Sequence, residues 1–245
     1  MKTGWIPYST VIPTLGTADA PSYPIVFAGV DLTSMLGVGM KVKFTQNSAT
    51  VFGIITAISF STNTTVTLYC GTDYSVANTG TYPITNFNYS TQKAPLNFPT
   101  NPEKWTVTLT DTTLRRQSNP TTNTLYNVGN LNIVIPIGLW ITKCQLTLGW
   151  GRYSTGQGEC KFALSTSTSS ISTTDFNGVV TGCNNATSSA TDVRGGYYRE
   201  KVLSLAAKAT YYTLIFTSQD LGNEGFIDLR NDLVPLYIKA ICAYL

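Results

Sequence analysis

The chain of 245 residues contains no histidine. This absence excludes Ser-His and Cys-His nucleophilic systems and any metal site with histidine ligands. Charged residues are also scarce, at 12% of the chain, which is about half the share of an ordinary soluble domain. The net charge of +3 produces no strong field, and we interpret the basic pair Arg115-Arg116 as part of a solvated loop. We therefore expect no nucleic-acid partner.

Long apolar runs are missing too, so we expect no membrane insertion, and the N-terminus has no apolar run of signal-peptide length. The cysteines have no C-x-x-C spacing, and the glycine pairs lack the spacing of a phosphate loop. We expect buried thiols in a protein that folds in a reducing cytoplasm, and no cofactor or metal. The five cysteines are Cys70, Cys144, Cys160, Cys183 and Cys242.

Threonine, serine and asparagine take the place of the missing charge, and apolar residues alternate with them at a period of two. The segment 53–74 predicts two strands joined by a turn at Ser61–Thr64, and alternation before it extends a small β meander or barrel over residues 25–80. Helix signals are nearly absent. The segment 203–209 fits a short helix or a strand followed by a turn.

Three prolines then recur in the segment KAPLNFPTNPEKW, at positions 95, 99 and 102. This spacing favours an extended linker that makes few hydrogen bonds. We therefore expect an N-terminal β domain over residues 1–92, a linker over 93–104 and a C-terminal domain over 105–245.

The C-terminal part predicts seven or more strands joined by Gly, Asn and Ser turns, with loops at 165–174 and 184–191. Such a pattern is typical of a β-sandwich of jelly-roll type. The expected strands are 105–109, 131–135, 139–150, 160–164, 211–216, 225–229 and 236–245.

The last strand, LYIKAICAYL, is apolar on both faces. A strand of this kind must be covered on both sides. Leu236, Ile238, Ala240 and Cys242 form the expected inner face. Either an irregular part of the same chain or a neighbouring subunit covers the other face, and we expect a subunit interface. The expected interface residues are Tyr237, Ile241, Ala243 and Leu245.

Three strings carry a resemblance: GVGMKVKFTQ with TVFGIITAISFSTNTTVTLYCGTDYSVAN, the linker KAPLNFPTNPEKWTV, and the ending VPLYIKAICAYL. Together they resemble tailed-bacteriophage virion proteins of the tail-fibre, head-fibre and receptor-binding kind. The resemblance implies a virion location after assembly in the host cytoplasm, and a jelly roll similar to C1q- and TNF-like heads that forms a homotrimer. It also implies an N-terminal domain that attaches to other virion proteins.

Aromatic and guanidinium groups near glycine-rich turns suggest binding of a host-surface glycan, because rings stack on sugars and guanidinium groups bond hydroxyls. The same residues also fit a simple packing role at strand ends. The candidates are Trp150, Arg152, Tyr153, Tyr197, Tyr198 and Arg199.

We do not expect an enzyme. The alternative function is a free carbohydrate-binding module or a glycan hydrolase, and a hydrolase of this kind needs only two carboxyl groups several ångströms apart. The available acids are Glu159, Asp192, Glu200, Asp228 and Asp232.

Overall fold

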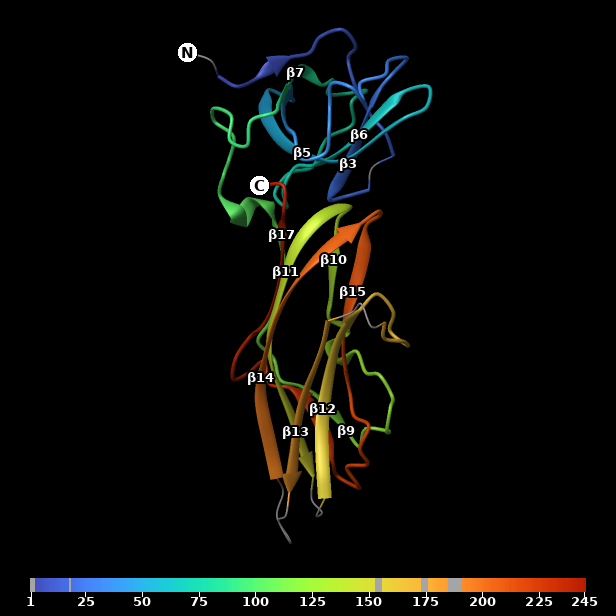
Figure 1. Cartoon of the computed structure of the whole chain (residues 1–245), viewed down its shortest axis with the longest axis vertical. Helices are drawn as coiled ribbons and strands as arrows, with labels where there is room; N and C mark the ends of the chain where they lie inside the picture. Colours follow the sequence, from blue (N-terminus) through green and yellow to red (C-terminus); the bar gives the residue numbers. More distant parts are fainter. Residues whose placement is uncertain (1–2, 18, 153–155, 173–175, 185–190) are drawn as a thin grey trace.

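The computed structural model describes residues 3–17, 19–152, 156–172, 176–184 and 191–245, with the backbone only at 156–157, 177–184 and 191–192. Two β domains lie end to end along the long axis (Figure 1). In the described ranges, no helix is long and apolar enough to cross a membrane. The expected all-β class is confirmed, because the only helices described there are two short 3-10 turns, at Pro102–Trp105 and Val128–Asn130.

The N-terminal domain is one curled sheet of seven strands in the order β1-β7-β4-β5-β6-β3-β2. Its centre is the meander expected from the alternating segments. Apolar residues inside the curl, among them Phe27, Phe44 and Val66, form a separate core. The strands are β1 (Ile6–Pro7), β2 (Thr14–Leu15), β3 (Ser22–Phe27), β4 (Lys41–Gln46), β5 (Ala49–Phe60), β6 (Thr64–Tyr69) and β7 (Thr85–Ser90).

The C-terminal domain is a sandwich of two sheets. One has the order β10-β15-β12-β13, and the other contains β8-β17-β11 with β14 on the far side of β11. We call these the B sheet (β10-β15-β12-β13) and the A sheet (β8-β17-β11-β14, extended by β16 and β9). The strands are β8 (Thr106–Asp111), β9 (Arg115–Ser118), β10 (Asn132–Ile135), β11 (Gly138–Arg152), β12 (Gly156–Ser165), β13 (Phe176–Asn184), β14 (Thr191–Leu205), β15 (Ala209–Phe216), β16 (Phe226–Leu229) and β17 (Leu236–Cys242).

Along the chain, β8 and β9 lie in the A sheet, β10 in the B sheet, β11 in the A sheet, β12 and β13 in the B sheet, β14 in the A sheet, β15 in the B sheet, and β16 and β17 in the A sheet. These crossings give the topology of a jelly roll. Strand β11 is the axis of the A sheet: β14 pairs with its whole length, while β17 and β16 share the other edge. The segment 203–209 is the end of β14 followed by a turn, and contains no helix.

The core of the sandwich comes from one face of each strand. On β11 the inward positions include Trp140, Cys144 and Leu148, all fully buried. On β17 the buried residues are those of the expected inner face, Leu236, Ile238, Ala240 and Cys242. The alternation predicted for the last strand is therefore confirmed.

The junction between the domains is packed. Tyr69 of β6 lies edge-on to Trp140, with ring centroids 5.0 Å apart, and Phe98 stacks on Trp105 at 5.1 Å. The indole N–H of Trp105 donates to the carbonyl of Pro99. The segment expected to be a linker with few hydrogen bonds thus contributes the buried ring of Phe98 to the junction, where it packs on the buried Trp105 that follows the segment.

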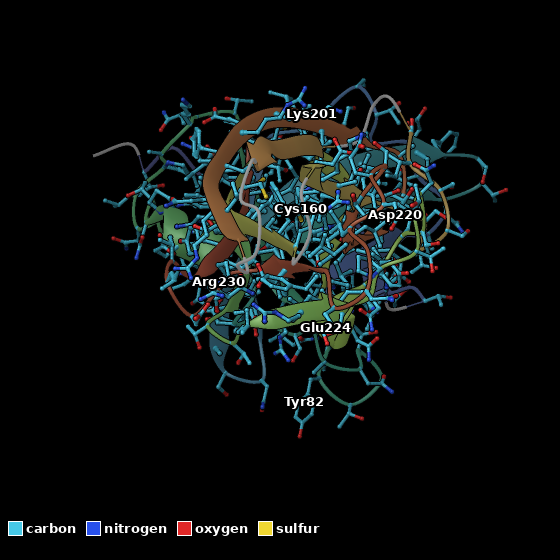
Figure 2. All side chains as sticks on the ribbon, turned by 90° about the horizontal axis from the view of Figure 1, so that it is seen from below. Tyr82, Cys160, Lys201, Asp220, Glu224 and Arg230 are labelled. Carbon is cyan, nitrogen blue, oxygen red and sulfur yellow. The ribbon has the colours of Figure 1, made fainter. Side chains whose placement is uncertain are left out.

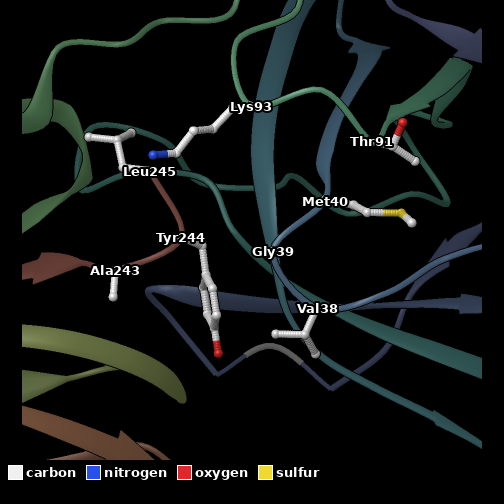
Figure 3. Close-up of a pocket in the computed structure, with 8 residues that line it drawn as sticks. All are labelled: Val38, Gly39, Met40, Thr91, Lys93, Ala243, Tyr244 and Leu245. Atoms are coloured by element: carbon white, nitrogen blue, oxygen red, sulfur yellow. The ribbon is translucent and has the colours of Figure 1, made fainter.

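A buried lysine also joins the domains. The Nζ of Lys41 donates to the carbonyl of Gly39 in its own domain and to that of Tyr244 in the other. Burial lowers the pKa of the Lys41 amine. Beside these contacts lies a hollow of about 340 Å³ between Val38–Met40, Thr91, Lys93 and Ala243–Leu245 (Figure 3).

Four cysteines, Cys70, Cys144, Cys160 and Cys242, are buried free thiols. Burial raises the pKa of the Cys70 thiol to about 12, so this thiol is inert at neutral pH. The expectation of buried thiols is confirmed for these four, and the side chain of Cys183 lies outside the described residues.

Candidate interaction face

The outer face of the A sheet carries an apolar row near the domain junction. Ile241 of β17 lies opposite Ile141 of β11, which lies opposite Val202 of β14. Directly opposed residues of antiparallel strands point to the same side of the sheet. Val202 is 59% exposed, and both isoleucines are half-buried. Three branched apolar side chains therefore form a continuous row that faces solvent.

A charged row follows toward the distal end. Lys239 lies opposite Lys143, a like-charge pair that would be unfavourable by itself. Each lysine has its own carboxylate partner: Glu200 lies 3.2 Å from Lys143, and Glu103 pairs with Lys239. The row is therefore neutral, and it separates the apolar row from the residues beyond it.

The next row contains Tyr237, Gln145 and Tyr198 on neighbouring strands. Tyr198 is 61% exposed. Beside it the surface sinks into a hollow of about 420 Å³, whose lining includes Thr147, Gly196 and Val234. A Cβ added at Gly196 would meet no atom within 4 Å, so this glycine keeps the floor of the hollow open.

The exposed apolar residues of the C-terminal domain are distributed unevenly. The large ones in the part of the chain that the structure describes are Leu114, Tyr198, Val202, Leu233 and Val234. All of them belong to strands of the A sheet or to turns between its strands. Within the described residues, the B sheet has none. Clustering of this kind marks a surface that contacts a partner or ligand.

The predicted glycan-binding residues do not form one site. Trp150 is fully buried. Its ring packs so closely on Gly158 that a Cβ added to this glycine would lie only 2.2 Å from the ring. Its assignment to a surface site is wrong, because period-two alternation turns its side chain into the sandwich core. Tyr197 also faces inward and packs on Phe162, with ring centroids 5.6 Å apart.

The other predicted residues lie apart from one another. Tyr198 is on the outer face, beside the hollow. Arg199 is exposed on β14 and hydrogen-bonds to Tyr197. Burial raises the pKa of Tyr197, and the bond from Arg199 lowers it by less, so the net pKa is raised. Arg152 is the last residue of β11 at the distal end, and Tyr153 lies outside the described residues.

The predicted interface residues fall into two groups. Tyr237 and Ile241 lie on the outer face of the A sheet and are half-buried. Ala243 and Leu245 line the hollow at the domain junction, next to Val38 and Lys93 (Figure 3). The N-terminal domain of the same chain thus covers the end of the last strand, while Tyr237 and Ile241 on the rest of its outer face are only half-buried by the part of the chain that the structure describes.

The carboxyl groups considered for a hydrolase are held in ion pairs. Asp228 is fully buried, with Arg116 at 2.8 Å, and Arg230 lies 3.2 Å from Asp232. For Glu159, burial raises the pKa, but bonds from Ser218 and Lys161 outweigh it, so the net pKa is lowered. A general acid needs a raised pKa. Glu200 pairs with Lys143, and the side chain of Asp192 lies outside the described residues.

Sequence reasoning missed Gln145, Thr147 and Val234 around the hollow, and it assigned Arg116 to a loop, whereas Arg116 lies on β9 against Asp228. No local pattern marks these residues. They become neighbours only through the pairing of β11 with β14, β16 and β17.

No protein-family model matches the chain, and no curated protein is similar to it. Among solved structures, that of infectious bursal disease virus, Gx strain, is 9% identical and has a TM-score of 0.28. The match covers 96% of this chain, which spans 63% of the length of the viral chain.

Two bacterial structures are similarly remote. The isomalto-dextranase of Arthrobacter globiformis T6, complexed with panose, is 11% identical, with a TM-score of 0.20, over 94% of this chain and 36% of that one. The tandem CBM22 domains of Xyn10C from Paenibacillus barcinonensis are 10% identical, with a TM-score of 0.19, over 99% and 94%. At these TM-scores the likenesses carry no argument about function.

Proposed function

We propose that the protein is a virion structural protein of the tail-fibre, head-fibre or receptor-binding kind. The observation that carries the proposal is the partly exposed apolar row Ile241–Ile141–Val202 on the A sheet. Exposed rows of branched side chains on a flat sheet favour association. The resemblance of the sequence to phage virion proteins supplies the class of protein and its location in the virion.

In this proposal three copies associate through the proximal part of the A sheet, with Tyr237 and Ile241 in the contact. A closed ring of subunits buries the row once per subunit and leaves no surface for open-ended growth. The number three comes from the resemblance to proteins with C1q- and TNF-like heads.

The N-terminal domain is proposed to attach to other virion proteins. It has a core of its own, and residues of the segments 7–13 and 84–88 line a hollow of about 430 Å³. No charged residue lines this hollow. Its chemistry suits an uncharged, largely apolar segment of a partner.

Binding of a host-surface glycan is proposed for the hollow beside Tyr198. The exposed ring can stack on a sugar, while Gln145 and Thr147 offer hydrogen-bonding groups at the same hollow. This hollow lies four residues along β14 from Val202, or about 13 Å at the rise of a strand. Assembly and glycan binding therefore use different parts of one face.

The alternative is a free carbohydrate-binding module or glycan hydrolase, which would normally be monomeric. Light scattering of the purified chain separates the two functions. A virion protein assembled as proposed has about three times the chain mass of 26.6 kDa. A strictly monomeric protein at micromolar concentration, together with its absence from purified virus particles by mass spectrometry, would overturn the proposal.

A further inference from the structure

The hollow beside Tyr198 spans three neighbouring segments of the A sheet. Tyr198 and Gly196 lie on β14, and the residues opposite them on β11 are Gln145 and Thr147. Directly opposed residues of antiparallel strands point to the same side of the sheet. On the other side of β11 lies the turn between β16 and β17, which contributes Val234. An aromatic ring, a polar middle and a branched apolar side chain therefore follow one another across the hollow.

Backbone hydrogen bonds hold this turn against β11. The N–H of Arg230 donates to the carbonyl of Thr147 at 2.8 Å, and the N–H of Val234 donates to the carbonyl of Arg230 at 3.3 Å. In the view from the distal end, Arg230 lies toward the outside, away from the central Cys160 (Figure 2). The turn is therefore at the outside of the sandwich, and Val234 is 39% exposed beside the hollow.

A buried side chain fastens the same turn to β8. Asn231 is 1% exposed, and its Nδ2 donates to Oδ2 of Asp111 at 2.6 Å. Arg115 also holds Asp111, with 2.7 Å between Nη2 and Oδ1. The side of the hollow that Val234 forms is thus fixed before any ligand binds, which reduces the entropy lost on binding.

The polar middle of the hollow has unused hydrogen-bonding capacity. Within the part of the chain that the structure describes, the amide of Gln145 and the hydroxyl of Thr147 make no hydrogen bond. An amide and a hydroxyl can each donate and accept. No charged residue is among the described residues that line the hollow. The best complement is therefore a neutral group that both donates and accepts hydrogen bonds.

Sugar substituents differ in how they would meet Val234. A hydroxyl group placed against this side chain would lose water without gaining a partner, which costs free energy. The methyl group of a 6-deoxy sugar suits Val234 but brings no hydrogen-bonding group to Gln145. An acetamido group carries an N–H, a carbonyl and a terminal methyl, so it can bond to the polar middle and bury its methyl group against Val234. The order of groups across the hollow matches this substituent.

We propose that the hollow selects N-acetylated amino sugars. The sugar ring stacks on Tyr198, the acetamido N–H and carbonyl bond to Gln145 and Thr147, and the methyl group packs on Val234. At about 420 Å³, the hollow lies within the size range of small-molecule sites. The inference rests on the glycan-binding role proposed above for the same hollow, and it adds the class of sugar and the role of Val234.

Saturation-transfer NMR titrations of the full-length protein test the class of sugar. The probes are the methyl glycosides of N-acetylglucosamine and glucose, of N-acetylgalactosamine and galactose, and of rhamnose, a 6-deoxy sugar. Each of the first two pairs differs only in an acetamido group against a hydroxyl group. We expect at least one N-acetylated sugar to bind roughly tenfold more tightly than its partner, the gain from one buried methyl group and one hydrogen bond. Its acetyl methyl group should receive the most saturation.

Two variants test the residues assigned to the acetamido group. Val234→Thr removes one methyl contact at nearly constant volume, and it should weaken binding of the N-acetylated sugar roughly fourfold and leave its hydroxyl partner unchanged. The matched control Val38→Thr alters a valine that is 46% exposed in the N-terminal domain, and it should change neither. Gln145→Met keeps the length of the side chain and removes the amide, so it should weaken the N-acetylated sugar roughly fivefold.

A further variant tests the hollow itself. A Cβ at Gly196 would meet no atom within 4 Å, so Gly196→Val should fold and fill the hollow with its side chain. We expect it to abolish the binding of every sugar without changing the circular dichroism spectrum. Sugar binding that survives in Gly196→Val would place the site elsewhere and overturn both proposals for the hollow.

Equal affinity within both pairs would overturn the inference while leaving the glycan-binding role intact. Tighter binding of rhamnose than of either N-acetylated sugar would do the same, because it would show that the apolar side of the hollow acts without the amide. Binding of none of the probes would overturn both. Light scattering of the same samples reports assembly separately, so a monomeric protein does not affect the result.

Discussion

The two outer faces of the C-terminal sandwich differ in how they are completed. On the B sheet, Glu159 and Leu214 are buried, and the segment after β15 bonds to Glu159 through Ser218. On the A sheet, Val202 and Tyr198 remain largely exposed. One face is therefore covered by the chain itself, whereas the other presents apolar and charged groups in rows that remain partly exposed.

The largest effect on folding is expected at a position in the core between the two sheets. Ile238 is fully buried on β17, between Cys144 of β11 and Leu109 of β8. In Ile238→Asp an unpaired carboxylate would enter the core, at a cost of several kcal/mol that is comparable to the stability of a domain. We expect an insoluble or disordered chain by circular dichroism and solubility. A soluble variant with a native β signal would contradict the assignment of this side to the core.

The second-largest effect is expected on assembly, and it distinguishes the outer face of the A sheet from that of the B sheet. Ile241→Asp places a carboxylate in the apolar row, where the isolated chain leaves it partly in water. We expect a folded monomer, because an unpaired charge is costly only once a neighbour covers it. The control Thr210→Asp, on β15 next to the inward Tyr211, should leave the mass measured by light scattering unchanged. An Ile241→Asp protein that remains trimeric would remove the last strand from the interface.

A third test concerns the end of the sandwich that the N-terminal domain covers. Tyr69 contacts Trp105 and Trp140, and its hydroxyl has no hydrogen-bond partner among the described residues. Tyr69→Ala should lower the free energy of unfolding by about 3–5 kcal/mol, as for other large aromatic residues. Tyr69→Phe should be neutral or slightly stabilising, because it removes an unsatisfied polar group. Urea unfolding measures both, and equal losses would disprove the packing role.

The same contacts bear on separating the domains. A fragment that begins at residue 105 loses the Phe98 ring and the Pro99 carbonyl that Trp105 uses. A fragment of residues 93–245 keeps both. The expectation that the C-terminal domain assembles without the N-terminal one stays a prediction, and the longer fragment is the better test.

The smallest effect on stability is expected when the pH is lowered, and it concerns the outer face of the B sheet, which the chain itself covers. Bonds from Ser218 and Lys161 hold the pKa of Glu159 below its ordinary value of 4.5 despite burial. A lowered carboxyl pKa contributes stability above the unfolded value, and this stability is lost as the pH falls through the folded pKa. We expect wild type to lose about 1 kcal/mol more than Glu159→Gln between pH 6 and pH 3. Identical pH profiles would show that Glu159 does not stabilise this face.

The sequence predicted strands wherever alternation was long and uninterrupted. The seven expected C-terminal strands are all present, from β8 to β17, within a few residues of their expected bounds. It missed β9, β13 and β14, although β14 has fifteen residues. The reason is clearest for β14. Its consecutive glycines, Gly195-Gly196, and the charges that follow them hide the alternation. Because β14 lies at the edge of the A sheet and pairs only with β11, its sequence also shows little alternation of apolar residues.

The candidate site was less predictable than the fold. Tyr198, next to two glycines, was identified correctly as a surface residue. Trp150 was assigned to the surface, but it lies two positions after the inward-facing Leu148 on the same strand, so alternation places it in the core as well. The ion pair between Arg116 and Asp228 could not be predicted at all, because the two residues are 112 positions apart. Only the pairing of β9 with β16 makes them neighbours.

By itself, the sequence determined the all-β class, the buried thiols at four described cysteines and the division of β17 into an inner and an outer face. These are local properties, since side chains on a strand alternate whatever the strand pairs with. The tertiary structure decided which residues share a row, which face the chain covers itself, and that Phe98 and Trp105 tie the domains together. Register between distant strands fixes those neighbours, and no local pattern encodes register.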